Sequence, residues 1–258
     1  MGTYTDPRRT QAVLFDLDDT LFDHRASTRC ALRAVQAAFR VYQAWPITEF
    51  EHRHAVLLEL LHVEVLAGRM SVDQARVERF GRLAIDAGGS EADPRAAEIA
   101  RSYREAYVSS WKPVPGAREV LAMLHEQARI GIVTNNVVAE QRQKVDTCGF
   151  TPLVDAVVIS EEIGVAKPDP RIFAACLERL GVDAGDAVMV GDSWPSDVLG
   201  ARAAGLRAVW FNRSGAPAPD GSAITQLAAL EPADAVTSVL LRAGLPTYAA
   251  SVWGEGTP

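Results

Sequence analysis

Acidic residues gather in two short stretches of this 258-residue chain, and their spacing allows them to act together. Asp16 and Asp18 follow an apolar run at 12–15, while Asp192 and Asp197 lie near each other much later in the chain. Side chains two apart on an extended segment point the same way, so Asp16 and Asp18 should share a face. Carboxylates in such a group can attack an electrophile, transfer protons or hold a divalent cation.

Two further polar segments follow apolar runs. Thr134 and Asn135 end one such run, and Lys167 lies in the segment 164–170. Each has an ordinary structural explanation when taken alone: Thr134 can begin a turn, Lys167 can be a solvated loop lysine, and an aspartate such as Asp192 can cap a helix. Four polar segments in this order nevertheless favour one functional site.

The elements that must position these residues alternate along the chain. Apolar runs at 12–16, 130–134, 154–160, 187–192 and 207–212 predict strands, and the segments 115–128, 138–148, 170–180, 194–204 and 233–242 predict helices. This alternation predicts an α/β, Rossmann-like three-layer core with a parallel sheet. Ligands of such sheets bind beyond the carboxyl ends of the strands, which is where the polar segments lie.

The segment between the first two polar motifs has a different pattern. Residues 23–111 show helical spacing and no convincing strand, with Thr48/Glu51 and Ser71/Gln74 as expected capping boxes. We therefore expect a catalytic core of residues 1–22 and 112–258, interrupted by an all-helical cap domain at 23–111.

Composition excludes several classes of protein. The chain is 48% hydrophobic and 23% charged with a net charge of −7, which is ordinary for a globular protein and disfavours a nucleic-acid polymer or an anionic membrane as partner. Its three scattered cysteines and polar N-terminal segment predict a cytoplasmic protein without a zinc site or signal peptide. Whether it is a monomer or a homodimer stays open.

Together the motifs resemble those of the haloacid dehalogenase superfamily. The matching segments are FDLDDTL at 15–21, IVTNN at 132–136, the Lys167-Pro168 pair and VGDSWPSD at 190–197. The helical insertion looks like the small C1-type cap of the phosphatase branch. The stretch VVISEEIGVAKP at 157–168 is most similar to bacterial phosphatases that act on nucleoside monophosphates.

This resemblance implies a mechanism and a cofactor. Asp16 would attack phosphorus to form an aspartyl-phosphate, and Asp18 would protonate the leaving oxygen and then activate water. Asp16, Asp192 and Asp18, the last through its backbone carbonyl, would hold Mg²⁺. The remaining motif residues would bind phosphate, namely Thr134, Asn135 and Lys167.

The resemblance assigns Asp197 a supporting role. It would orient Lys167 or a water on the metal ion rather than bind the ion directly.

Other reactions of the superfamily fit the residues less well. Dehalogenases need no acid at the position of Asp18, and phosphonate hydrolases need a cap lysine, whereas the insertion 23–111 contains none. The expected activity is therefore Mg²⁺-dependent hydrolysis of a small-molecule phosphate monoester. A phosphosugar mutase, or a catalytically silent binding protein with the same fold, remains the alternative.

The substrate is expected to be set by the cap. His24 and Arg25 follow the first motif closely enough to contact substrate, although the residues favour the alternative that both face solvent at the start of the first cap helix. Nucleoside monophosphates rank first as substrates and sugar phosphates next.

Overall fold

A computed structural model describes residues 10–89 and 95–242 of the chain. The chain divides into two compact units. One unit consists of Met1–Phe22 together with Pro113–Pro258, and the other is the continuous segment Asp23–Lys112.

The first unit is built on a six-stranded parallel sheet, which confirms the α/β prediction. The strands lie in the order β3-β2-β1-β4-β5-β6. Their bounds are Ala12–Phe15 for β1, Arg129–Thr134 for β2, Ala156–Ile159 for β3, Ala187–Gly191 for β4, Arg207–Phe211 for β5 and Gln226–Leu227 for β6. The order places β1 between β2 and β4, so the motifs that follow these three strands are brought to one edge.

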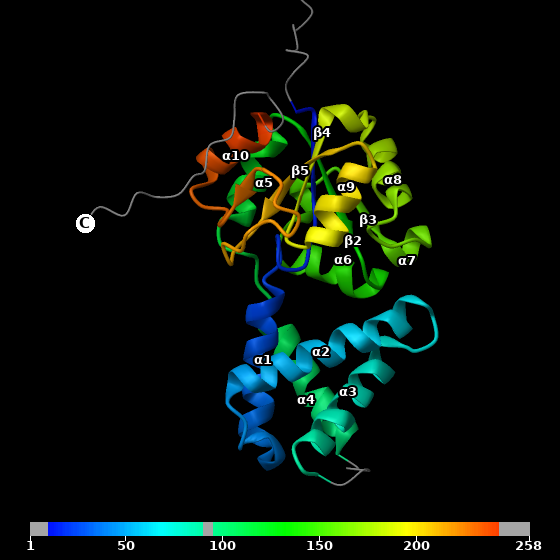
Figure 1. The fold of residues 1–258 in the computed structure, drawn as a ribbon, viewed down its shortest axis with the longest axis vertical. Coiled ribbons are helices and arrows are strands. Elements are labelled where there is room, and N and C mark those ends of the chain that lie inside the picture. The colour runs from blue at the N-terminus through cyan, green and yellow to red at the C-terminus, as the bar shows by residue number, and fades with distance from the viewer. Residues whose placement is uncertain (1–9, 90–94, 243–258) are drawn as a thin grey trace, which may run out of the picture. The chain divides into compact units, whose positions relative to one another are not determined.

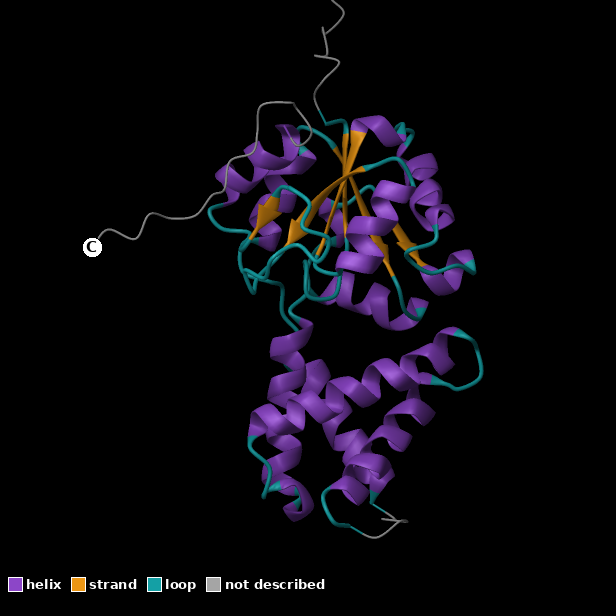
Figure 2. Cartoon of the chain, in the orientation of Figure 1, coloured by secondary structure: helices purple, strands orange, loops and turns teal. Residues whose placement is uncertain are grey.

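Helices cover both faces of this sheet (Figures 1 and 2). All four residues of β1 are fully buried, as expected for a strand with apolar packing on both sides. Figure 1 shows α5 and α10 on one side and α8 and α9 on the other. The helices and short turns of this unit are α5 (Ala117–His125), α6 (Val138–Thr147), η2 (Thr151–Leu153), α7 (Ser160–Ile163), α8 (Pro170–Leu180), η3 (Ala184–Asp186), η4 (Trp194–Leu199), α9 (Gly200–Ala203) and α10 (Ala233–Arg242).

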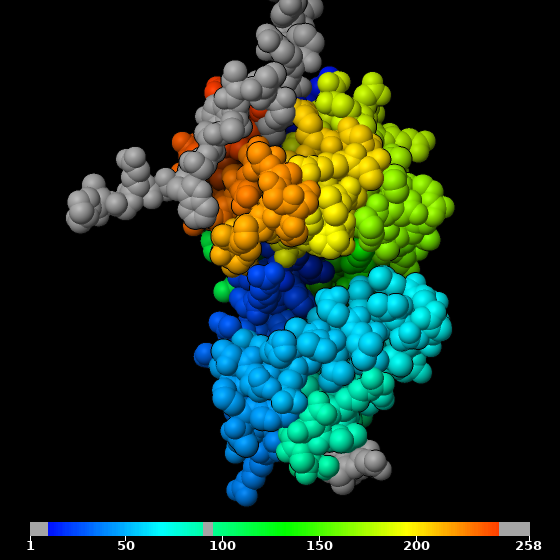
Figure 3. Space-filling model, in the orientation of Figure 1, coloured from blue at the N-terminus to red at the C-terminus, as the bar shows by residue number. Residues whose placement is uncertain are grey.

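The segment after β4 differs from the single helix that the sequence predicts. It begins as a π-helix, η4, and continues as the short α9. Trp194 packs edge-to-face on Trp210 of β5, with ring centroids 5.0 Å apart. Ala218 and Ile224, from the loop that leads to β6, pack on this pair. The yellow and orange segments accordingly form a continuous surface in Figure 3. The sequence did not predict β6, because this strand is only two residues long.

The second unit is all-helical within its described residues, with the elements α1 (His24–Ala38), η1 (Arg40–Tyr42), α2 (Ile47–Leu66), α3 (Val72–Asp86) and α4 (Ala96–Ser109). The Ser71/Gln74 capping box at the start of α3 is confirmed. The Thr48/Glu51 box is wrong, because Pro46 is the N-cap residue of α2 and the helix begins at Ile47, which leaves Thr48 inside its first turn. An aromatic core joins the helices through Tyr42, Phe50, Phe80 and Tyr103.

The two ends of the helical segment are neighbours. The Asp23 amide donates to the Lys112 carbonyl at 3.1 Å, and Phe22 forms an antiparallel bridge with Pro113. The chain thus leaves β1 and returns toward α5 through paired strands of backbone. None of the helices described at 10–89 and 95–242 is long and apolar enough to cross a membrane.

Candidate active site

The motif residues meet at the carboxyl end of the sheet because of the strand order. Asp16 directly follows β1, and its amide donates to Val190 of β4 at 2.9 Å. Thr134 ends β2 on the other side of β1. The site is therefore built on the neighbouring strands β2, β1 and β4, whose residues are all buried except Arg129.

Lys167 joins two of the carboxylates. Its Nζ donates to Asp16 Oδ1 at 2.6 Å and to Asp197 Oδ1 at 2.7 Å. All three side chains are at most one-tenth exposed. A buried ammonium shared by two buried carboxylates is held by short, charge-assisted hydrogen bonds, so its position is closely defined.

The electrostatics of this cluster favour a further cation. Burial raises the pKa of Asp16 well above its usual value, and the charges of Asp197 and Asp192 add to this rise, although Lys167 opposes it. Burial alone would lower the pKa of Lys167, but Asp16 and Asp197 outweigh it and the pKa is raised. Lys167 therefore stays charged, yet one ammonium does not balance three carboxylates.

The carboxylates themselves form a suitable cation site. Oxygen atoms of Asp16, Asp192 and Asp197 lie within 4.8 Å of one another. Oxygen donors grouped in this way are the ligands that Mg²⁺ prefers, so the donor set fits this ion. Asp197 belongs to the group by distance, but its Oδ1 accepts from Lys167 and its Oδ2 accepts from the Ser193 amide at 3.0 Å.

Gly191 makes room for Asp197. A Cβ atom added at Gly191 would lie 2.3 Å from Asp197 Oδ2 and 2.5 Å from its Cβ. A side chain cannot be accommodated there without moving the aspartate. The glycine that ends β4 is thus required by the close approach of Asp197, rather than by a special backbone angle.

Asn135 and Thr134 contact the other motif residues. Asn135 Oδ1 accepts from the Lys167 amide at 2.7 Å, and its Nδ2 donates to the Lys167 carbonyl at 3.0 Å. Thr134 is buried, and its hydroxyl accepts from Gln141 Nε2 at 2.7 Å. The side chain of Asn135 therefore positions Lys167, a role that the sequence did not indicate.

Asp18 contacts two residues that sequence reasoning missed. Lys144 Nζ donates to Asp18 Oδ1 at 2.7 Å, and Gln141 Nε2 donates to Asp18 Oδ2 at 2.9 Å. A signal was present, because Gln141 and Lys144 occupy the same stripe of the predicted helix as Val145 and would be expected to be buried with it. Polar residues on a buried stripe indicate a partner in the interior.

The two residues predicted to contact substrate from the cap lie at the start of α1. His24 Nδ1 lies 2.7 Å from the Tyr107 hydroxyl, and its Nε2 lies 3.3 Å from Thr28 Oγ1. Both ring nitrogens are thus engaged within the helical unit. Arg25 is exposed.

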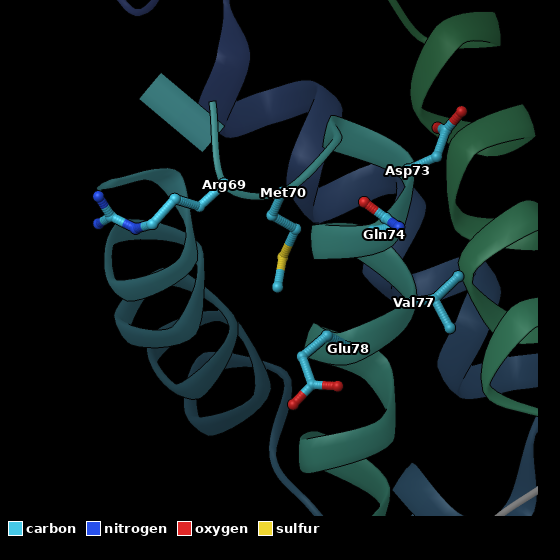
Figure 4. A pocket seen from close by; sticks show the side chains of 6 residues that line it. All are labelled: Arg69, Met70, Asp73, Gln74, Val77 and Glu78. Carbon is cyan, nitrogen blue, oxygen red and sulfur yellow. The ribbon is translucent and has the colours of Figure 1, made fainter. Parts of the chain in front are cut away.

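The helical unit also has an open cavity of about 530 Å³ at the turn from α2 into α3 (Figure 4). Its lining residues are Arg69, Met70, Asp73, Gln74, Val77 and Glu78. None of the residues predicted for the site is among them, and Figure 4 shows Arg69 and Met70 on the connecting turn and the other four side chains along α3. This cavity is separate in sequence and composition from the carboxylate cluster.

Comparison with known proteins agrees with this arrangement. A family model described as haloacid dehalogenase-like hydrolase matches residues 10–205. The chain is 32% identical to pyrimidine 5'-nucleotidase YjjG of Escherichia coli over 83% of its own length and 91% of that protein. It is 34% identical to a phosphoserine phosphatase of Thermus thermophilus, covering 78% of this chain and 88% of the relative.

A solved structure gives the same result for the fold. The HAD-hydrolase YfnB of Bacillus subtilis, described as bound to magnesium, superposes with a TM-score of 0.70 at 27% identity, covering 89% of this chain and 99% of that one. The family match spans all four motifs and both units. With its carboxylates and Lys167 gathered at the end of a parallel sheet, the chain belongs to the haloacid dehalogenase-like hydrolases.

Proposed function

We propose that the chain is a Mg²⁺-dependent phosphomonoesterase that forms an aspartyl-phosphate on Asp16. One observation carries the proposal: Asp16 lies at the end of β1 within 2.6 Å of the Lys167 ammonium and inside a group of three carboxylates. A nucleophile that attacks an anion needs cations around it, and this position supplies one and has ligands for another.

In the first half-reaction an Asp16 carboxylate oxygen attacks phosphorus in line with the ester oxygen. The new O–P bond forms as the P–O bond to the leaving alcohol breaks. Asp18 donates a proton to the departing oxygen, so the alcohol leaves uncharged. The products of this step are the aspartyl-phosphate and an ionised Asp18.

In the second half-reaction Asp18 accepts a proton from water as the water oxygen attacks the same phosphorus. The bond between Asp16 and phosphorus breaks, inorganic phosphate leaves, and both aspartates return to their starting states. Asp18 thus serves as acid and then as base, which requires its carboxyl group to stay at the same place through both steps.

The phosphoryl group is bound by the polar groups around Asp16. Lys167 offsets its charge, while the Thr134 hydroxyl and the backbone amide of Asn135 donate to its oxygens. Asp16, Asp192 and the backbone carbonyl of Asp18 would hold Mg²⁺, which, when bound, supplies positive charge to the phosphate. Asp197 orients Lys167, to which it is hydrogen-bonded.

The proposed substrate is a small phosphorylated metabolite, with nucleoside monophosphates ahead of sugar phosphates. Similarity to a pyrimidine 5'-nucleotidase supports this order, although the similarity to a phosphoserine phosphatase shows that the leaving group varies among relatives. We propose that the helical unit, residues 23–111 by sequence, selects the substrate.

The test is phosphate release from a panel of monoesters, with Mg²⁺ and with EDTA. The panel contains nucleotides, sugar phosphates, phosphoserine, phosphoglycolate and an aryl phosphate. Release that needs Mg²⁺ supports the proposal, and one substrate far above the others identifies the leaving group. No release from any of them counts against a phosphatase and favours a mutase.

Asp16→Asn tests the nucleophile in the same assay. It keeps the shape of the side chain and removes the attacking charge, so turnover should fall below detection while the circular dichroism spectrum is unchanged. Hydrolysis by this variant at the wild-type rate would contradict the aspartyl-phosphate mechanism.

A further inference from the structure

Helix α6 presents two buried polar side chains to Asp18. Lys144 and Gln141 are three residues apart, so they lie one above the other on the same face of the helix. Lys144 is 1% exposed and Gln141 is fully buried. Each of them donates to a different oxygen of the Asp18 carboxylate, at 2.7 Å and 2.9 Å.

This arrangement defines the orientation of the carboxylate. Asp18 is about a quarter exposed, and a half-buried aspartate normally retains some freedom about its two side-chain torsions. Donors on both oxygens restrict the position of the group and also the rotation of its plane. The donors are themselves rigid, because they project from a helix whose buried face also includes Val145.

The amide of Gln141 connects Asp18 to the phosphate-binding segment. Its Nε2 donates to the Thr134 hydroxyl as well as to Asp18, at 2.7 Å and 2.9 Å. Its Oε1 is buried without a hydrogen-bond partner among the described residues. Rotating the Gln141 amide by half a turn would place Oε1 against the Asp18 carboxylate, and an amide oxygen cannot donate a hydrogen bond. The observed orientation, with Nε2 toward Asp18, is therefore the one that gives Asp18 a donor.

Lys144 has surroundings that keep it charged and in place. Burial alone would lower its pKa, but Asp18 and Glu140 outweigh this and the pKa is raised. Its Nζ lies 3.5 Å from Glu140 and 5.0 Å from the centre of the Phe22 ring. Replacing a buried ion pair by apolar groups is often neutral or stabilising, so stability alone does not account for a lysine here.

We propose that Lys144 and Gln141 are positioning residues that hold the Asp18 carboxyl group toward the leaving oxygen of the substrate. The inference rests on the proposed function, in which Asp18 transfers protons in both half-reactions. Neither residue contacts the phosphoryl group in this proposal. Loss of Lys144 should therefore impair proton transfer and leave phosphate binding and attack by Asp16 intact, whereas loss of Gln141 also removes a partner of the Thr134 hydroxyl.

Esters with different leaving groups separate an effect on proton transfer from an effect on phosphate binding or on attack by Asp16. An alkyl phosphate needs a proton on its departing oxygen, whereas 2,4-dinitrophenyl phosphate expels a stable phenolate without one. The experiment measures the first turnover with enzyme in excess of substrate, in Mg²⁺, by release of the alcohol or phenolate. It compares wild type, Lys144→Met, Gln141→Met and the control Arg142→Met, which alters an exposed cation on the same helix.

For Lys144→Met we expect the first-turnover rate with the alkyl ester to fall about 100-fold, the lower end of what a general acid contributes. With 2,4-dinitrophenyl phosphate that rate should change less than about threefold, and the enzyme concentration that gives half of the maximal first-turnover rate should be unchanged for both esters. With this aryl ester in excess, the variant should release a burst of one phenolate per enzyme followed by slow turnover, because the second half-reaction still needs Asp18 as base. Gln141→Met should show the same pattern to a smaller degree, and Arg142→Met should match wild type.

An equal loss with both esters would overturn the inference, since a general loosening of the site slows both alike. An unchanged rate with the alkyl ester in both Lys144→Met and Gln141→Met would also overturn it. If Lys144→Met does not fold, the pattern in Gln141→Met decides. Failure of the proposed function looks different: wild type would then release nothing, or Asp16→Asn would retain activity.

Discussion

Asn135 holds the backbone of Lys167 from both sides, accepting from its amide at 2.7 Å and donating to its carbonyl at 3.0 Å. One side chain at the end of β2 thereby fixes a loop residue 32 positions later in the chain. The ammonium at the end of that loop residue contacts Asp16 and Asp197. The placement of the cation beside Asp16, the proposed nucleophile, therefore depends on the side-chain amide of Asn135, which does not touch that cation.

Replacing Asn135 by alanine should consequently act through Lys167. Each backbone group left without its partner costs about 1–3 kcal/mol, so we expect kcat/KM to fall by about 10- to 100-fold. The measurement is a double-mutant cycle with Lys167→Met. The double variant should be no slower than Lys167→Met alone, and additive losses would show that Asn135 acts independently of the lysine.

Gly191→Ala should impair both stability and activity. The added methyl group would overlap Asp197, and forcing extra atoms into a packed interior typically costs about 1–3 kcal/mol. Displacing Asp197 also removes one of the acceptors of Lys167, so kcat should fall together with the melting temperature. Gly185→Ala is the matched control, because an added Cβ there has nothing within 4 Å. Equal behaviour of the two variants would show that Gly191 is not under steric constraint.

The three cysteines should differ in reactivity. Burial raises the pKa of Cys148 to about 11 and that of Cys176 to about 12, whereas Cys30 is exposed. Since the thiolate is the reactive form, a disulfide reagent at pH 8 should titrate one thiol rapidly in the native protein and three in denaturant. Cys30→Ser should abolish the fast phase, and a fast phase that persists in this variant would show that an interior thiol is accessible.

His54 should make the stability of the helical unit depend on pH. Burial lowers its pKa well below 6.5, with Arg79 and His24 acting in the same direction, and neither ring nitrogen has a hydrogen-bond partner among the described residues. Below pH 6.5 the unfolded chain therefore binds a proton at His54 that the folded chain does not bind. The contribution of neutral His54 to the free energy of unfolding is present above pH 6.5 and is lost as the pH falls below that value. The expected slope is at most about 1.4 kcal/mol per pH unit, the value for one proton.

Denaturant unfolding between pH 7.5 and 5.5 measures this effect, with His54→Phe as the comparison. The phenyl ring suits the neighbouring Phe80 and Tyr103 rings and carries no unsatisfied nitrogen, so the variant should lose the His54 part of the slope. A slope identical to that of wild type would assign the pH dependence to other groups.

Much of the fold follows from local pattern. The runs that form β1 and β4 are uninterruptedly apolar, and the carboxylates that follow them mark where the strands end. The Ser71/Gln74 box starts α3 as expected because the reciprocal hydrogen bonds need only residues three positions apart. The Thr48/Glu51 prediction failed because the proline two residues earlier already sets the start of α2.

The site was harder to foresee where it depends on contacts between distant elements. Gln141 and Lys144 share a stripe with Val145, which indicates burial, but only the placement of α6 against Asp18 shows which partner they meet. Asn135 was expected to bind phosphate, and the contact of its side chain with Lys167 is a further role that the sequence did not indicate. Such roles arise from contacts between side chains of distant elements, which the periodicity of a single segment cannot predict.

The pairing of Asp23 with Lys112 and of Phe22 with Pro113 bears on how such a protein can change over evolutionary time. Because the two ends of the helical segment are neighbours, the length of the segment does not affect the spacing of the strands that flank it. The segment can be exchanged for another, longer or shorter, while β1 and β2 keep their register. If the helical unit selects the substrate, as proposed, catalytic chemistry and substrate choice are free to diversify separately, in keeping with relatives that are named for nucleotides in one case and for a phosphorylated amino acid in another.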